Sequence, residues 1–208
     1  MIFFGELITF DSVPKHNYMT SIKPFQATDL FELTPINLDP LTENFYLYFY
    51  HQYLYTWPTL SYKSVDDDNQ PTGYMLAKTE GKNKEWHAHI SAVTVDPNYR
   101  RVGLGSYLCD QLRIVVEPER PIHAWFIDLF VKCSNKTAIT LYEKLGYSVY
   151  RRVVGYYETG DMSNINKKKT NDEIDAFDMR LSLARDVNNE SIRENGRKFH
   201  VLPEEVVF

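Results

Sequence analysis

The sequence predicts one α/β (α+β) domain in which helices flank a mixed central β-sheet, and three stretches indicate this fold class. Residues 122–131 form a near-continuous apolar run, as expected for a strand that is covered on both faces. Residues 103–116 carry leucines at helical spacing along one face, whereas residues 86–95 alternate with the period of two that a strand requires. With 208 residues, of which 43% are hydrophobic, the chain is long enough to bury one such core.

The charge balance argues against two broad classes of partner. The formal net charge is −5 and the pI is near 5.7, so the overall charge gives no reason to expect binding to DNA or to an anionic membrane. No apolar run is long enough for a transmembrane helix. An anionic ligand would therefore have to be held by a local group of basic residues.

Two cysteines, Cys109 and Cys133, both lie in apolar stretches. Two free core cysteines fit a reducing compartment, which predicts a cytoplasmic protein and leaves a disulfide unsupported. A nucleophilic role for Cys133 would need a neighbouring base, and none is evident in the sequence.

The two ends of the chain differ in character from its middle. Residues 1–18 are partly apolar but contain Glu6 and Asp11 and no basic leader, so they do not resemble a signal peptide. We therefore expect an N-terminal extension over 1–18 that the fold does not need, a folded domain over 19–184 and a polar, extended tail over 185–208.

An unusually aromatic helix is expected near the start of the domain, after a short strand at 21–25 and a short helix over 28–33. Asp39 is a suitable cap and Pro40 a suitable first residue for a helix over 41–55. Aromatic side chains surround this helix on nearly every side: Phe45, Tyr46, Tyr48, Phe49, Tyr50, Tyr53 and Tyr55. Only one stripe of them fits into a core, so we expect the others to line a substrate groove or to contact another protein.

The remaining elements follow from apolar periodicity and from turn residues. Strands at 59–65 and 73–79 flank an acidic turn, which we interpret as a solvated loop. Asn135 is a suitable cap for a later helix. After residue 95 we expect a helix over 103–116, a strand over 122–131, a helix over 135–146, a strand over 147–154, a polar loop over 161–175 and a last strand over 177–183.

One face of the strand over 86–95 is polar. By its period of two, His87, His89 and Ser91 share this face with Val93 and Val95. Two histidines and a serine are poor core material, so we expect His87 to be hydrogen-bonded or exposed and His89 to have a functional role. A zinc site is disfavoured, because no third ligand of the cysteine or carboxylate type is evident nearby.

The loop after this strand has the features of a phosphate-binding site. Arg100, Gly103 and Gly105 follow a Val-Thr-Val strand end and open a helix. Backbone N–H groups at a helix start face an anion, glycines allow close approach, and Arg100 and Arg101 add charged donors. The loop lacks the lysine of a Walker A motif and the third glycine of a dinucleotide-binding fingerprint.

The spacing Arg-x-x-Gly-x-Gly after a strand resembles the acetyl-CoA signature of the GNAT acetyltransferases. A second segment, from Asn135 to Tyr147, is similar to the Asn-x-x-Ala-x-x-Leu-Tyr-x-x-x-Gly-Phe/Tyr segment of protein N-terminal acetyltransferases, where the Asn and the Tyr contact CoA. The resemblance covers roughly residues 20–184 and implies the GNAT fold, with acetyl-CoA as co-substrate and no metal. It implies these CoA-binding residues: Val93, Val95, Arg100, Arg101, Val102, Gly103, Leu104, Gly105, Asn135 and Tyr142.

Further segments resemble the catalytic subunits of NatB-type N-terminal acetyltransferases, namely residues 37–43, 85–89, 128–131, 147–151 and 178–180. Enzymes of that type acetylate the α-amine of proteins that begin Met-Asp, Met-Glu, Met-Asn or Met-Gln. They work on the ribosome with a large helical-repeat auxiliary subunit. The resemblance therefore implies a cytoplasmic, ribosome-associated heterodimer that acts on nascent peptide N-termini, with the auxiliary subunit bound through the aromatic helix 41–55. Phe45 departs from the pattern, since a tyrosine is expected there in the peptide-contacting turn.

The chemistry of acetyl transfer to an α-amine fits these residues. An α-amine has a pKa of about 8, so a weak base acting through water is sufficient. The resemblance and the strand pattern together suggest that the backbone N–H of Val93 polarises the thioester, that Tyr142 protonates the leaving thiolate, and that His89 binds the second residue or relays the proton. The expected substrate-binding residues are Glu43, His89, Ser91, Phe130, Tyr156 and Tyr157.

Three other functions share parts of this pattern. A GNAT enzyme for lysine side chains or small amines has the same CoA loop but a different peptide groove. A non-catalytic acyl-CoA-binding subunit would not need Tyr142, His89 and Asn135. The polar face of two histidines and a serine favours a polar second residue over the preference of an N-terminal acetyltransferase for an apolar one.

Overall fold

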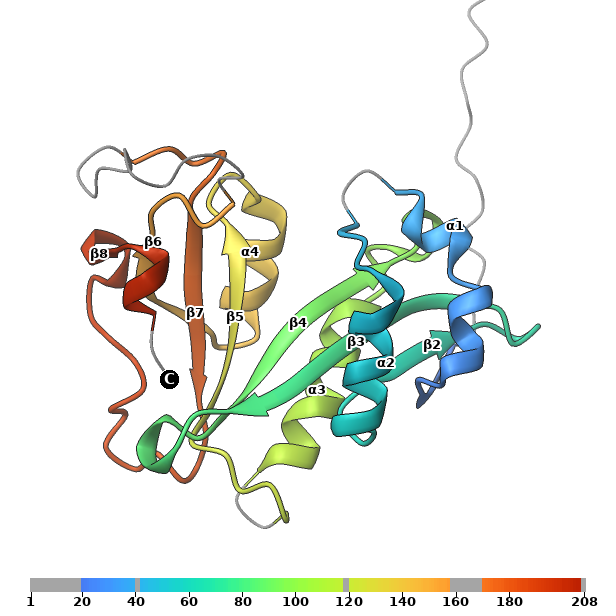
Figure 1. Cartoon of the computed structure of the whole chain (residues 1–208), viewed down its shortest axis with the longest axis horizontal. Helices are drawn as coiled ribbons and strands as arrows, with labels where there is room; N and C mark the ends of the chain where they lie inside the picture. The colour runs from blue at the N-terminus through green and yellow to red at the C-terminus, as the bar shows by residue number, and fades with distance from the viewer. Residues whose placement is uncertain (1–19, 40–41, 118–119, 158–169, 207–208) are drawn as a thin grey trace, which may run out of the picture.

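The computed structural model describes residues 20–39, 42–117, 120–157 and 170–206; the predicted extension over 1–18 lies outside them. Within these ranges one sheet contains eight strands: β1 (Ser21–Pro24), β2 (Tyr62–Val65), β3 (Pro71–Glu80), β4 (His87–Val95), β5 (Phe126–Lys132), β6 (Ser148–Val153), β7 (Ala176–Ser182) and β8 (His200–Val201). Their order across the sheet is β1-β2-β3-β4-β5-β7-β6-β8 (Figure 1). The pairs β4–β5 and β6–β8 are parallel and the others antiparallel, so the predicted mixed sheet is confirmed.

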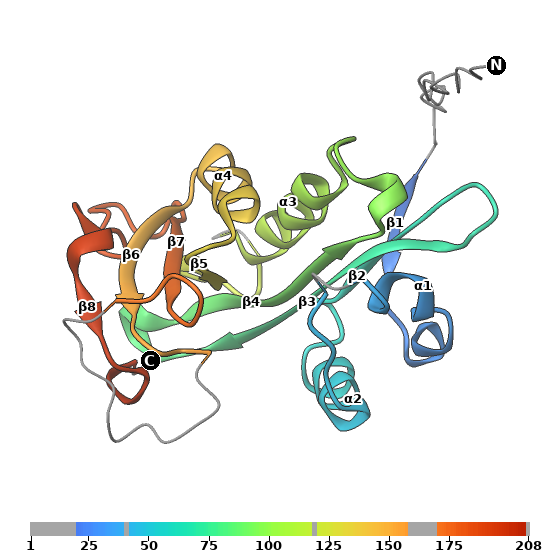
Figure 2. The same ribbon diagram turned by 90° about the horizontal axis from the view of Figure 1, so that it is seen from above.

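The α-helices are α1 (Thr34–Asn37), α2 (Leu47–Thr56), α3 (Leu104–Val116) and α4 (Lys136–Lys144), and short 3-10 helices are η1 (Ala27–Phe31), η2 (Asn83–Glu85), η3 (Pro97–Tyr99), η5 (Gly196–Lys198) and η6 (Pro203–Glu205). Helices α1 and α2 lie on one face of the sheet, and α3 and α4 on the other (Figure 2). Each pair packs on its own hydrophobic core, so the sheet is covered on both faces as its apolar strands require. No helix in the described ranges is long and apolar enough to cross a membrane.

The aromatic helix is shorter than predicted. α2 begins at Leu47 rather than at residue 41, and the preceding residues 42–46 are not helical. Asp39 does not cap it, because the Asp39 carboxylate instead accepts a hydrogen bond from Arg100 at 2.9 Å. The segment before α2 is therefore a loop, and this loop brings Glu43 and Phe45 to the sheet rather than to a helix surface.

A β-bulge interrupts the alternation of β4. Leu76 of β3 pairs with Ala92, whereas its neighbour Ala77 pairs with Ile90, so Ser91 is an extra residue on β4. An extra residue reverses which side chains face each side of the sheet. The expectation that Val93 and Val95 share the face of His89 and Ser91 is therefore wrong, because both valines pack into the core beneath α3.

β4 and β5 run side by side only near their starts. Parallel pairing extends from Ala88–Ile127 to Ile90–Leu129, and beyond these pairs the two strands diverge (Figure 1). The second half of β4, which includes Val93, therefore has β3 on one edge and an opening on the other.

The direction of the Val93 N–H follows from the pairing of β4 with β3. The N–H of Asp96 donates to the carbonyl of Thr72 at 2.8 Å. Donors of an antiparallel strand alternate between its two edges, so the N–H of Val93, three residues earlier, faces away from β3. It points into the opening between β4 and β5.

Residues 185–206 do not form the extended tail that their polarity predicts. β8 pairs in parallel with β6, and the Asp186 carboxylate is buried, where it accepts bonds from the backbone of Glu190 and Ser191. Gly196 packs so closely on β6 that a Cβ there would lie 1.8 Å from the Val149 carbonyl oxygen. Polar composition misled the prediction because these residues satisfy their polar groups through local turns.

Candidate active site

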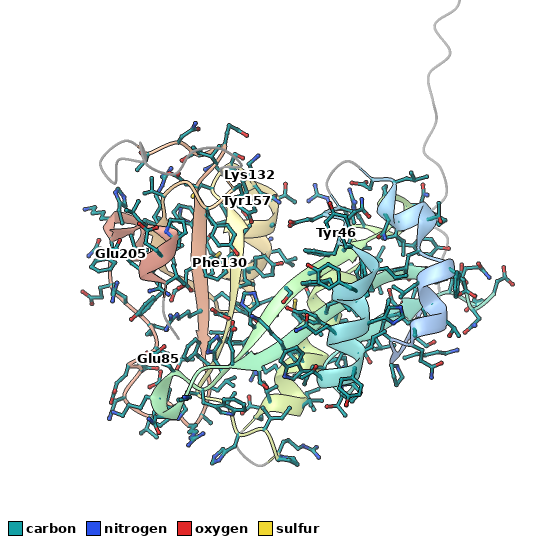
Figure 3. All side chains as sticks on the ribbon, viewed as in Figure 1. Tyr46, Glu85, Phe130, Lys132, Tyr157 and Glu205 are labelled. Carbon is teal, nitrogen blue, oxygen red and sulfur yellow. The ribbon has the colours of Figure 1, made fainter. Side chains whose placement is uncertain are left out.

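A pocket of about 410 Å³ opens on the α2 face, near the point where β4 and β5 separate. It is lined by Glu43, Phe45, Phe49, Tyr53, Lys78, His89, Ser91, Phe130, Tyr156 and Tyr157. All six residues predicted to bind substrate are among them. Phe130 and Tyr157 lie on one side of the opening and Tyr46, at the start of α2, on the other (Figure 3).

Aromatic rings form much of the pocket surface. Phe49 stacks on Phe45 with ring centroids 4.2 Å apart and on Tyr53 at 4.3 Å, while Phe130 stacks on Tyr156 at 4.7 Å. Such a surface suits an unbranched apolar side chain, which gains from contact with ring faces. Phe45 contributes a ring without a hydroxyl, so this side chain has no hydrogen bond to offer a ligand.

Sequence reasoning missed Lys78 as a pocket residue, and it placed Phe49 and Tyr53 among the helix aromatics without saying which of these would line a groove. Phe49 and Tyr53 are four residues apart, and this spacing places them on one face of α2. Lys78 is opposite His89 in the β3–β4 register, so the two side chains share a face. Both signals are present in the sequence, but the second can be used only when the strand register is known.

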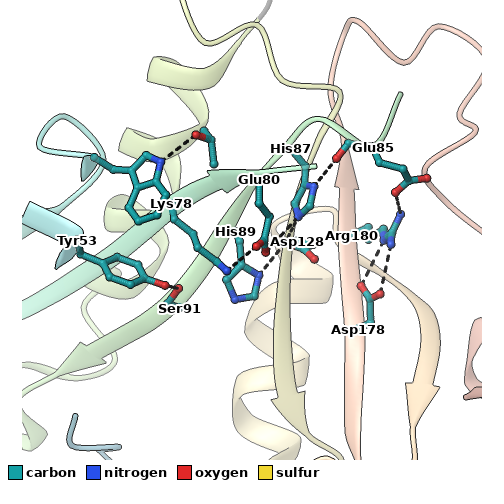
Figure 4. Close-up of polar contacts among 12 residues, drawn as sticks. Tyr53, Lys78, Glu80, Glu85, His87, His89, Ser91, Asp128, Asp178 and Arg180 are labelled. Atoms are coloured by element: carbon teal, nitrogen blue, oxygen red, sulfur yellow. Dashed lines mark hydrogen bonds and ion pairs between the residues drawn. The ribbon is translucent and has the colours of Figure 1, made fainter. Parts of the chain in front are cut away.

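His89 is hydrogen-bonded to a buried carboxylate. Its Nδ1 lies 2.9 Å from Oδ1 of Asp128, which is fully buried (Figure 4). Burial raises the pKa of Asp128, but the charges of His89 and His87 outweigh burial, and the net pKa is lowered. An ionised carboxylate only accepts hydrogen bonds, so Nδ1 carries the proton and Nε2 remains as the acceptor of His89.

His87 lies behind this pair and is fully buried, stacked on Phe126 with ring centroids 4.6 Å apart. Its Nδ1 is 2.6 Å from the Glu85 carbonyl and therefore donates, while Nε2 faces Asp128 at 3.4 Å and Glu80 at 3.7 Å. Burial lowers the pKa of His87, but the charge of Asp128 and the contact with Glu80 raise it overall. The Nε2 atom of His87 therefore faces two carboxylates, which favour its protonated form.

Glu80 places a carboxylate next to His87 and His89. The sequence had given no sign of a carboxylate near these two histidines. The β3–β4 register places Glu80 opposite His87, and ligand atoms of Glu80, His87 and His89 lie within 4.8 Å of one another. These groups already have other partners, since Lys78 Nζ donates to Glu80 at 2.5 Å and Asp128 accepts from His89. We therefore interpret the cluster as an ion-pair network.

The predicted phosphate-binding loop, residues 100–105, has a backbone suited to an anion. Gly103 has a φ of 94° and precedes α3, and no side chain caps this helix start. The first N–H groups of α3 are therefore available to a phosphate. Arg100 is bonded within the protein, to the Val95 carbonyl at 2.8 Å and to Asp39, so it fixes the loop to the end of β4.

Asn135 and Tyr142 position α4. The Asn135 side chain accepts from the Ala138 N–H at 3.0 Å, which confirms the predicted cap. Tyr142 is buried in the same core as Val93, on the face of the sheet opposite to the pocket. Burial raises the pKa of Tyr142 well above its usual value, so this phenol stays protonated at neutral pH.

Comparison with known proteins places the chain in a family. Residues 29–147 match the family model for the acetyltransferase (GNAT) family. The chain belongs to the GNAT family. It is 52% identical over 197 residues to the N-terminal acetyltransferase B complex catalytic subunit NAT3 of Saccharomyces cerevisiae, which covers 91% of this chain and all of that protein. It is also 52% identical over 192 residues to the corresponding catalytic subunit naa20 of Schizosaccharomyces pombe, with 91% of this chain and all of that protein covered.

Solved structures agree with this placement. The chain matches the NatB acetyltransferase complex bound to a bisubstrate inhibitor with a TM-score of 0.79 and 54% identity, over 90% of this chain and 99% of that one. It matches Naa20 of Chaetomium thermophilum in complex with a bisubstrate analogue with a TM-score of 0.78 and 40% identity, over 90% of this chain and all of that one. The predicted GNAT fold is therefore confirmed.

In this GNAT domain the two predicted halves of the site lie on opposite faces of the sheet. The pocket that the predicted substrate residues line is on the α2 face, while Val93, Tyr142 and the loop 100–105 belong to the α3–α4 face. The divergence of β4 and β5 connects the faces, and the N–H of Val93 points into it. The opening between β4 and β5 thus joins the pocket on one face to the loop and helices on the other.

Proposed function

We propose that this chain is the catalytic subunit of a NatB-type N-terminal acetyltransferase. It transfers the acetyl group of acetyl-CoA to the α-amine of nascent proteins that begin Met-Asp, Met-Glu, Met-Asn or Met-Gln. The observation that carries the proposal is the His89–Asp128 pair beside an aromatic pocket, in a chain that is 52% identical to catalytic subunits of N-terminal acetyltransferase B complexes.

The pocket receives the peptide N-terminus. Phe45, Phe49 and Phe130 surround the side chain of the first methionine, and Tyr156 and Tyr157 cover the peptide backbone. The Glu43 carboxylate binds the α-ammonium group before it loses its proton, since opposite charges attract most strongly where water is partly excluded.

His89 removes the proton from the amine, either directly or through one water. Asp128 keeps the proton of the neutral imidazole on Nδ1, so the lone pair is on Nε2, and it stabilises the imidazolium that forms. An α-amine has a pKa of about 8 and needs only a weak base of this kind. Ser91 adds a hydroxyl donor for the second residue of the peptide.

The opposite face of the sheet holds acetyl-CoA, which supplies the activated acetyl group. The N–H groups at the start of α3 bind its pyrophosphate, and Val95, Arg101, Val102 and Leu104 complete the binding surface around the glycines. The N–H of Val93 donates to the thioester carbonyl oxygen as negative charge develops there. Tyr142, protonated at neutral pH, gives a proton to the departing sulfur.

The auxiliary subunit covers exposed aromatic residues of α2 and the loop before it. Tyr46, Tyr48 and Tyr55 are 81%, 69% and 90% exposed, which is unusual for three rings within ten residues of chain. This partner is a helical-repeat protein that brings the heterodimer to the ribosome in the cytoplasm. Replacing Tyr48 and Tyr55 by serine should abolish co-purification, whereas the same change at the distant exposed Phe199 should leave it intact.

One experiment tests the reaction and its substrate class. CoA release is measured with peptides that begin Met-Asp, Met-Asn and Met-Leu, with a Met-Asp peptide whose α-amine is blocked, and with a lysine-containing peptide that is also blocked. Release with Met-Asp and Met-Asn alone supports the proposal. Release with the blocked lysine peptide would identify a lysine acetyltransferase, and a preference for Met-Leu would refute the NatB-type specificity.

A further inference from the structure

The pocket holds a charge that the proposed mechanism does not use. Of the described residues that line it, Lys78 alone carries a fixed positive charge. It stands opposite His89 in the β3–β4 register, so its side chain leaves the sheet on the same face. The ammonium group therefore lies beside the proposed base, where the second residue of a peptide would follow the reacting N-terminus.

Lys78 is held in the pocket instead of extending into solvent. Its Nζ donates to Glu80 Oε2 at 2.5 Å, and the side chain is only 26% exposed (Figure 4). Burial raises the pKa of Glu80, but the His87 and Lys78 contacts outweigh it and lower this pKa to about 2, so Glu80 stays ionised. An ammonium group has three N–H donors, and the contact with Glu80 uses one of them.

We propose that Lys78 reads the charge of the substrate's second residue by binding its carboxylate. This inference rests on the proposed function and divides its substrates into two classes. Ser91 offers a hydroxyl that can donate to the side-chain oxygens of Asp, Glu, Asn and Gln alike. A fixed cation adds affinity only for Asp and Glu, because a charge-assisted hydrogen bond is stronger than one to a neutral amide.

The remaining charges of the site agree with this assignment. Glu43 is the pocket's negative group and matches the ammonium of the peptide N-terminus, while Lys78 matches a carboxylate one residue later. Behind the pocket, Glu80 and Asp128 carry two negative charges against at most one positive charge on His87, and Lys78 balances the remainder through its contact with Glu80. A Met-Asp peptide therefore presents both of its charges to groups of opposite sign.

Two peptides of equal shape test the proposal. Lys78→Gln is compared with the unchanged protein, each with its auxiliary subunit, on peptides that begin Met-Asp and Met-Asn and are otherwise identical. We expect kcat/KM for Met-Asp to fall about tenfold, and kcat/KM for Met-Asn to change less than about twofold. Lys84→Gln is the matched control, since Lys84 pairs with Glu190 at 2.6 Å away from the pocket and should not alter the ratio.

Two results with Lys78→Gln would overturn the proposal, because in both the effect would not depend on the charge of the second residue. Equal losses of kcat/KM on the two peptides would make Lys78 a support for Glu80 and His87, and no loss on either peptide would remove Lys78 from recognition. A measurement without any variant gives an independent result. Raising the salt concentration from about 0.05 M to about 0.5 M should move the Met-Asp to Met-Asn ratio toward one, because ions screen the attraction.

A ratio of kcat/KM for Met-Asp to that for Met-Asn that does not change with salt concentration would also refute the role of Lys78 in recognising charge. The proposed function fails in a different way, namely if the unchanged protein and its partner release CoA with neither peptide. A protein that acetylates both peptides, with a ratio that neither Lys78→Gln nor salt affects, would retain the function and lose only this inference.

Discussion

His89 Nδ1 and Asp128 Oδ1 are 2.9 Å apart, and the residues that carry them are opposite one another in the parallel pairing of β4 with β5. Asp128 is fully buried on the face of β5 that its neighbours Ile127 and Leu129 do not use. The orientation of His89 is thus set by the register of two central strands. A side chain fixed in this way loses little rotamer freedom when the peptide binds.

Asp128→Asn should lower kcat with little change in the KM for peptide. An asparagine can also donate to Nδ1, which would place the imidazole proton on Nε2 and remove the base. We expect a loss in kcat of about 100-fold, by analogy with other carboxylate–histidine pairs in which the tautomer is lost. Steady-state kinetics with a Met-Asp peptide measure this change.

Asp178→Asn is the control for that loss. Asp178 is equally buried, on the same face of the sheet, but it pairs with Arg151 and Arg180 rather than with His89. It should lower thermal stability as much as Asp128→Asn does and leave most of kcat intact. A similar loss of kcat in both variants would mean that burial of charge, and not the tautomer of His89, controls the reaction.

Tyr53→Phe should destabilise the junction between α2 and β4. The hydroxyl groups of Tyr53 and Ser91 are 2.6 Å apart and half-buried, so removing one leaves the other without its partner. We expect a loss of about 1 kcal/mol in the free energy of unfolding. Denaturant unfolding of Tyr53→Phe, Ser91→Ala and the double variant measures the coupling, and fully additive losses would contradict a direct bond.

Gly105→Ala should weaken acetyl-CoA binding without destabilising the fold. A Cβ at Gly105 would lie 3.5 Å from Leu141, which is ordinary contact, and alanine favours the helical conformation by about 0.5–1 kcal/mol. The added methyl group should nevertheless obstruct the approach of the pyrophosphate and raise the dissociation constant about tenfold. Calorimetric titration with acetyl-CoA and thermal unfolding give the two quantities.

Gly103→Ala is the complementary variant. Gly103 has a φ of 94°, so alanine there is strained although nothing lies within 4 Å of the added Cβ. It should lose about 1 kcal/mol or more in stability. For the other variant, Gly105→Ala, a dissociation constant for acetyl-CoA equal to that of the parent would mean that the loop does not approach its ligand closely at Gly105.

Glu80→Gln should remove the part of the folding stability that comes from the ionised Glu80 carboxylate. The folded-state pKa of Glu80 is about 2 against an ordinary value of 4.5, so the charged form favours the folded state. This contribution is complete above about pH 4.5 and is lost as the pH falls toward about 2. The difference in Tm between parent and variant should therefore narrow over that interval.

The exposed Glu190 supplies the comparison for the pH series. It also pairs with a lysine, Lys84, but at the surface, where water screens the pair. Glu190→Gln should change Tm much less than Glu80→Gln at neutral pH. A difference between parent and Glu80→Gln that stays constant from about pH 6 to about pH 2.5 would contradict the lowered pKa of Glu80.

Local signals in the sequence were enough for most of the fold. Asn135 caps α4 as predicted, and α3 ends at Val116 as expected from its leucine stripe. The start of α2 was misplaced, because Asp39 and Pro40 form a cap signal that tertiary structure overrides when Asp39 binds Arg100. Polar residues after 184 gave no periodic pattern, so β8 was not predicted.

Site residues that lie in segments resembling a known family could be predicted from the sequence. Those that reach the site through the pairing register of two strands could not. The six predicted substrate residues all line the pocket, whereas Lys78 and Glu80 come to it through pairing of β3 with β4. Asp128 was part of a recognised segment but received no role, because a single carboxylate in an apolar strand gives no hint of its partner. Ser91 is an inserted residue, and strict alternation therefore misplaced Val93 and Val95.

The bulge at Ser91 has a consequence for how firmly the reacting groups are held together. The proposed proton acceptor, His89, and the proposed carbonyl donor, the N–H of Val93, are four residues apart on one continuous strand, yet they serve opposite faces of the sheet. Their separation is thus determined by bonded geometry and not by how two domains or two helices dock. A shift of α2 or α4 against the sheet would therefore leave the spacing of these two residues along β4 unchanged.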